Sequence, residues 1–149
     1  FSVLISKLVE EGKIDKAKLA AEKCETELPS YNIPHDGGTG SIEIATAVIA
    51  CGEYDRAINI LDQVANKSRE YSEYYLSLNN PRFVSSAREC LQDIRIMLNV
   101  HNILQNASKN KAIGEKSSAF ENKAKDFEIA VSGIYESFSR RCAENGIRF

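Results

Sequence analysis

One six-residue pattern occurs twice in this chain. Residues 12–17 read Gly-Lys-Ile-Asp-Lys-Ala, and residues 52–57 read Gly-Glu-Tyr-Asp-Arg-Ala. Both therefore consist of glycine, a variable residue, an apolar residue, aspartate, a basic residue and alanine. Each hexapeptide separates two stretches whose apolar residues have helical spacing. A recurring unit of this kind is typical of helix-turn-helix repeats, in which the glycine permits a tight turn. The pattern therefore favours a chain built from stacked helical hairpins.

The whole chain is predicted to be a single all-α domain of antiparallel hairpins. Apolar residues recur at helical spacing, and no segment shows the two-residue alternation of a half-buried strand. The predicted parts are a first hairpin over residues 1–28, a loop insertion over 29–40, a second hairpin over 41–79 and a longer, divergent C-terminal hairpin over 83–145.

Residues that begin or end helices mark several of these boundaries. Ser41 is a candidate N-cap for the helix that follows the loop. In the last hairpin we expect helices over residues 84–104 and 117–143, joined by a polar turn over residues 106–114. Residues 145–146, Asn-Gly, have the composition that helix C-termini prefer.

Composition argues against several functional classes. The net charge is −2, and basic residues are interleaved with acidic ones, which disfavours nucleic acid as a partner. No run approaches the roughly 18–20 apolar residues of a membrane span. The chain does not begin with Met and starts within a helical pattern, so we expect it to be part of a longer protein.

The four cysteines are too far apart in sequence for the usual paired ligand motifs. They lack a C-x-x-C spacing, which argues against zinc, and we expect neither a metal nor a cofactor. Two disulfides remain arithmetically possible, although free Cys is often a small buried residue and that interpretation is favoured. The residues concerned are Cys24, Cys51, Cys90 and Cys142.

The hexapeptides and their surroundings resemble the tetratricopeptide repeat. Five residues after each glycine stand Ala17 and Ala57, and the helices around them carry apolar residues at matching offsets. The resemblance implies that both alanines lie where two helices approach closely, in a short solenoid. In the consensus, successive repeats begin about 34 residues apart. The two hexapeptides here are farther apart, and the loop over residues 29–40 accounts for the additional residues.

A narrower resemblance rests on two segments, Asn32-Ile33-Pro34-His35-Asp36 and Glu73-Tyr74-Tyr75-Leu76-Ser77-Leu78. With their surroundings, residues 27–83, they resemble the soluble C-terminal region of a bacterial family of polytopic membrane proteins. That family, formerly a domain of unknown function, is related to protein O-mannosyltransferases. The resemblance implies a non-catalytic accessory domain of a membrane glycosyltransferase-like protein, on the periplasmic side of the inner membrane. Its partner would be a protein or peptide, with the membrane part of its own chain as one candidate.

The loop over residues 29–40 and the tyrosine-rich segment over residues 71–75 supply the candidate binding residues. These are Tyr31, Asn32, His35, Asp36 and Tyr74. No catalytic set of nucleophile and base is visible in the sequence. Asn32 and Asp36 are also residues that bond neighbouring backbone groups in Asx-turns, and that interpretation of the loop is favoured. The alternative function is a stand-alone helical enzyme or small-ligand binder that uses the His35/Asp36 loop.

Two further expectations concern burial. The spacing of Tyr71, Tyr75 and Leu78 at i, i+4 and i+7 predicts that these three side chains face the core. The loop is expected to be ordered and to pack on the helices, with Tyr31 and Ile33 covered because both side chains are largely apolar.

Overall fold

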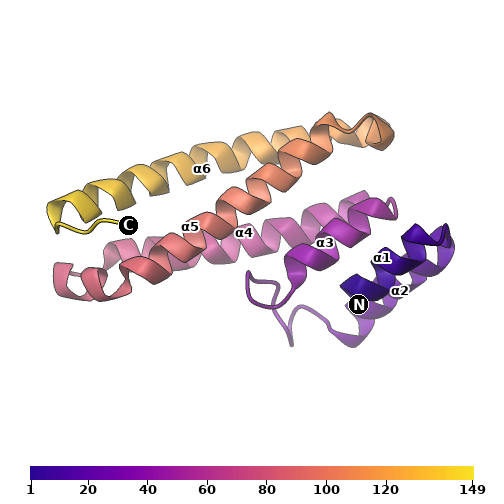
Figure 1. Ribbon diagram of the computed structural model, residues 1–149, viewed down its shortest axis with the longest axis horizontal. Helices are drawn as coiled ribbons and strands as arrows, with labels where there is room; N and C mark the ends of the chain where they lie inside the picture. Colours follow the sequence, from indigo (N-terminus) through magenta and orange to yellow (C-terminus); the bar gives the residue numbers. More distant parts are fainter.

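The chain folds into helices only. The computed structural model describes residues 1–149 and contains six α-helices, one 3-10 helix and no strand (Figure 1), so the predicted all-α class is confirmed. The elements are α1 (Ser2–Glu10), α2 (Ile14–Glu27), α3 (Ser41–Ala50), α4 (Tyr54–Ser77), α5 (Asn80–Lys109), the 3-10 helix η1 (Lys111–Lys116) and α6 (Ser117–Glu144). None of these helices combines the length and the apolar character needed to cross a membrane.

The two hexapeptides form the same turn. Gly12 and Gly52 have φ values of 71° and 87°, in the left-handed region that favours glycine. In each turn the glycine N–H donates to the carbonyl three residues earlier, and the next N–H donates to the carbonyl five residues earlier. This is the Schellman arrangement that ends a helix. Ala17 and Ala57, five residues after these glycines, are fully buried.

The helices pack in sequence order along the molecule. α1 and α2 lie against each other at one end, α3 contacts both α1 and α4, and the long helices α4, α5 and α6 run beside one another (Figure 1). Three apolar clusters hold them together. One joins α1, α2 and α3 with the start of α4, one joins α3 and α4 to α5, η1 and α6, and one lies between α5 and α6.

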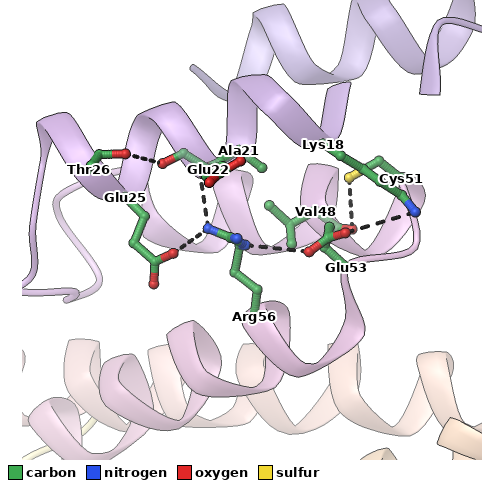
Figure 2. A network of polar contacts seen from close by, with 9 residues as sticks. All are labelled: Lys18, Ala21, Glu22, Glu25, Thr26, Val48, Cys51, Glu53 and Arg56. Atoms are coloured by element: carbon green, nitrogen blue, oxygen red, sulfur yellow. Dashed lines mark hydrogen bonds and ion pairs between the residues drawn. The ribbon is translucent and has the colours of Figure 1, made fainter. Parts of the chain in front are cut away.

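An arginine links the first hairpin to the second. The Arg56 guanidinium, at the start of α4, donates to the Glu25 carboxylate and to the Ala21 carbonyl at 3.5 Å, both in α2 (Figure 2). Its Nε lies 3.7 Å from Glu53 Oε2, and the other carboxylate oxygen of Glu53, Oε1, lies 3.9 Å from Lys18 Nζ. Arg56, the basic residue of the second hexapeptide, thus connects the first hairpin to the second.

A second arginine holds the turn between α4 and α5. Arg141, near the end of α6, donates to the carbonyl oxygens of Leu76 at 2.6 Å and Leu78 at 2.7 Å, and to Asn80 Oδ1 at 2.9 Å. Its guanidinium also lies 4.2 Å from the centre of the buried Phe83 ring. One side chain therefore joins the end of α4, the start of α5 and the end of α6.

Two predicted helix boundaries were wrong. The N-cap of α3 is Gly40, with φ of 74°, whereas Ser41 is the first helical residue and is 2% exposed. The Ser41 hydroxyl bonds the loop instead of the helix N-terminus. The segment predicted as a turn over residues 106–114 continues α5 to Lys109, because Ala107 packs into the core, and the break comes only at Asn110.

The predicted burial in the tyrosine-rich part of α4 was only partly right. Tyr71 is 42% exposed, whereas Tyr75 and Leu78 are partly buried and pack against the cluster between α5 and α6. The buried side of this part of α4 instead carries Ser68 and Ser72, at 2% and 0% exposure. Small side chains there let α5 approach closely. The cysteine interpretation held, because all four cysteines are buried free thiols.

Candidate functional site

The loop between α2 and α3 has two sides. Its consecutive polar residues His35 and Asp36 line different cavities. His35 lines a small enclosed cavity among α2, α3 and α4. Asp36 lines an open groove between α4 and α5. His35 and Asp36, although adjacent in the sequence, therefore do not belong to the same site.

The His35 side is an internal polar contact. Its Nδ1 lies 2.8 Å from Ser41 Oγ, and Ser41 Oγ lies 2.7 Å from Thr39 Oγ1. Burial lowers the pKa of His35 from its ordinary value of 6.5, and the nearby Glu25 carboxylate opposes this change. The enclosed space measures about 50 Å³, enough for a water molecule or two.

The Asp36 side begins with a local turn. Asp36 Oδ1 accepts from the Gly38 N–H at 2.7 Å, and the Asp36 N–H donates to Thr39 Oγ1 at 3.3 Å. This is the Asx-type bonding that the sequence predicted for Asp36. It fixes the segment Asp36–Gly38 as one wall of the groove.

The loop is seated on α5 through a glycine. A Cβ added at Gly37 would overlap the Ile96 side chain, so a larger residue here would require that side chain to move. The expectation that the loop packs on the helices was right, but the residues expected to do so were wrong. Tyr31 is 83% exposed and Ile33 is 44% exposed.

The groove beside Asp36 measures about 490 Å³. It brings Asp36 together with part of the tyrosine-rich segment, although the two are far apart in the sequence. Its polar and aromatic lining is made of Asp36, Ser68, Tyr71, Tyr75, Arg88, Glu89, Gln92 and Asp93. The other candidate residues lie outside it. Tyr74 is 59% exposed with its ring centre 5.6 Å from that of Tyr75, and Tyr31 and Asn32 are exposed on the loop.

The groove carries an excess of negative charge, because its lining has three carboxylates and one basic residue, Arg88. Asp36, Glu89 and Asp93 belong to none of the ten ion pairs in the structure. Burial raises the pKa of Asp93; a hydrogen bond from Ser68 opposes this change and the Asp36 charge adds to it. Burial also raises the pKa of Tyr75, with smaller contributions from the Asp93 and Glu89 carboxylates.

Glu89 and Asp93 were not singled out from the sequence. They lie at i and i+4 on α5, which places them on one face of that helix. That spacing alone describes any solvated helix surface. Only the packing of α5 against α4 and the loop shows that this face borders a groove. No group of three metal-ligating side chains converges anywhere in the structure.

Substitution of His35 by alanine should lower stability, because it removes the bond to Ser41 and leaves that buried hydroxyl with fewer partners. We expect a loss of about 1 kcal/mol in the free energy of unfolding. Tyr31→Ala is the control in the same loop, and at 83% exposure it should change this energy by less than about 0.5 kcal/mol. Chemical denaturation at pH 8 measures both, and the reverse ranking would contradict the loop geometry.

The same histidine should give a pH signature. Because its pKa is lowered in the folded state, the unfolded chain binds this proton more tightly, and stability is lost as the pH falls below 6.5. The His35→Ala variant should lack this part of the loss, so the two proteins should converge in stability at acidic pH.

No family model, curated protein or solved structure matches the chain.

Proposed function

We propose that this chain is a non-catalytic protein-interaction module of the tetratricopeptide type. The observation that carries the proposal is the contrast between its cavities. The open grooves between helices measure about 490 Å³ to about 850 Å³. The enclosed cavity at His35 measures only about 50 Å³, whereas sites for small molecules occupy several hundred Å³. Open grooves between helices suit a peptide segment or helix of a partner protein.

The matching turns at Gly12 and Gly52 support the repeat aspect of the proposal. Two helical pairs with the same turn hydrogen bonds, each followed by a fully buried alanine, are what a tetratricopeptide-like array requires. The longer pair α5 and α6 would then close the end of the array, as terminal units of solenoids do.

The wider context of the proposal comes from residues 27–83 and their resemblance to the membrane-protein family named above. In that setting the chain is the C-terminal part of a periplasmic, membrane-bound, glycosyltransferase-like protein, and it positions the enzyme or binds an acceptor protein. Sugar transfer itself would belong to the membrane part. The alternative, a small-ligand binder or enzyme that uses the His35/Asp36 loop, is supported less well because His35 and Asp36 line different cavities.

Peptide selection tests the proposal. A displayed library of random peptides, selected on immobilised residues 1–149, should enrich related sequences that bind with micromolar dissociation constants. The same protein should transfer no sugar from a lipid-linked donor to the selected peptides. Failure to enrich any sequence, or transfer by this chain alone, would contradict an accessory binding role.

A further inference from the structure

We propose that the groove between α4, α5 and the Asp36–Gly38 loop binds arginine or lysine side chains of a basic segment in the partner protein. This inference rests on the proposed function and specifies the chemistry of its partner.

The charges that line the groove are mainly negative. Asp36 comes from the loop, and Glu89 and Asp93 come from α5, while Arg88 is the one lining residue of opposite sign. Arg88 forms none of the ion pairs of the structure, and one basic residue leaves the lining with an excess of negative charge. Asp36 and Asp93 are half-buried and Glu89 is exposed, so a bound cation would stabilise chiefly the charged forms of the two half-buried carboxylates.

The aromatic lining fits the same occupant. Tyr71 and Tyr75 face the groove, and tyrosine rings attract guanidinium and ammonium groups over their faces. The rim already holds one such group, because Lys67 Nζ lies 5.0 Å from the centre of the Tyr71 ring. Lys67 forms its ion pair with Glu70, although its charge also interacts with that of Asp36 across the rim. A partner's basic side chain would occupy the groove itself.

The groove is also preformed. The Gly37 backbone packs directly on Ile96 of α5, and the Asx-turn at Asp36 holds the wall in place. Ser68, at 2% exposure, supplies a hydroxyl beside Asp93. A preformed site loses less conformational entropy when a ligand binds, which favours recognition of a flexible basic segment.

The largest groove of the molecule lacks this charge preference. It lies between α4 and α6, measures about 850 Å³, and is lined by residues of both signs. There Arg69 forms an ion pair with Glu73 at 2.9 Å, and Arg141 donates its hydrogen bonds to backbone carbonyls. The remaining charged residues, Asp126 and Arg140, have opposite signs, so this groove indicates no partner of one sign.

Fluorescence anisotropy tests the inference with defined probes. The probes are short labelled peptides in which glycine-serine pairs separate arginines, lysines or glutamates. The arginine and lysine peptides should bind the intact chain and the glutamate peptide should not. The double variant Glu89→Gln/Asp93→Asn should raise the dissociation constant about tenfold, as expected when two of the charges that attract the bound cation are removed.

A matched control separates the groove from general surface charge. Glu128→Gln/Glu136→Gln removes the same charge from exposed carboxylates of α6 that form no ion pair, and it should change the dissociation constant less than about twofold. Equal weakening in both double variants would overturn the inference. Circular dichroism and the melting temperature verify that each variant is folded.

Chemical-shift mapping of the unmodified protein gives an independent readout. Titration with the arginine peptide should move the amide signals of residues 36–38 and 88–96 more than those of α6. Signals that move elsewhere would overturn the inference. If peptides of other composition are selected while basic peptides fail to bind, the partner chemistry is wrong and the interaction module stands. If no peptide binds at all, both proposals fail.

Discussion

Substitution of Arg141 by methionine should destabilise the fold by about 2–4 kcal/mol, because hydrogen bonds to charged groups contribute more than neutral ones and their loss leaves acceptors unpaired. The Arg141 guanidinium donates to the carbonyls of Leu76 and Leu78, which lie at the end of α4. Carbonyls at a helix end have no partner within the helix. Methionine keeps much of the apolar stem over Phe83 but supplies no donor.

The neighbouring residue provides the control. Arg140→Met removes the same charge one position earlier, where the side chain is exposed and forms none of these bonds. It should change the free energy of unfolding by less than about 0.5 kcal/mol. Urea denaturation of the two variants measures the difference. Similar stabilities would mean that the Arg141 contacts contribute nothing beyond a surface charge.

Arg141 also illustrates what the sequence could not reveal. Its bonds to Leu76 and Leu78 span 65 and 63 residues, so they depend on how α6 returns past the end of α4. The sequence around it suggests only pairs at i and i+4, Glu136 with Arg140 and Arg140 with Glu144, on a solvated face. The contact of Arg56 with Glu25 across the hairpins is hidden for the same reason.

The parts that were predicted depend on local information. The turns at Gly12 and Gly52 follow from a glycine between two helical stretches, and the end of α6 at Asn145 and Gly146 follows from the same local chemistry. Apolar periodicity then identifies the helices. It fails near Tyr71, because close packing of α5 selects small serines for the buried face and turns the tyrosine outward.

Some residues of the candidate site could be predicted from the sequence, but the groove that they form could not. The loop residue Asp36 and the tyrosine-rich segment both attracted attention in the sequence, but their meeting in one groove depends on the seating of Gly37 against Ile96. The other two carboxylates of the groove, Glu89 and Asp93, lie on α5, in a part of the sequence that shows no motif. A groove built from three segments distant in sequence requires the tertiary structure to be seen.

Enlargement of Ala57 to leucine should destabilise the fold by about 1–3 kcal/mol through overpacking. Ala57 is fully buried in the cluster that joins α1, α2 and α3 to the start of α4. No space remains there for a larger side chain without movement of a helix, because interiors are close-packed. Ala50→Leu, at an exposed position near the end of α3, is the matched control and should have little effect.

Where in the molecule Ala57→Leu lowers stability is a sharper test than how much stability it removes. Because the Ala57 cluster attaches α1 and α2 to the rest of the molecule, Ala57→Leu should speed amide hydrogen exchange in residues 2–27 more than in α6. The cluster between α5 and α6 contains no residue of the first hairpin and should be little affected. A uniform increase in exchange across all helices, or an unchanged melting temperature, would mean that Ala57 does not form the close contact between the hairpins.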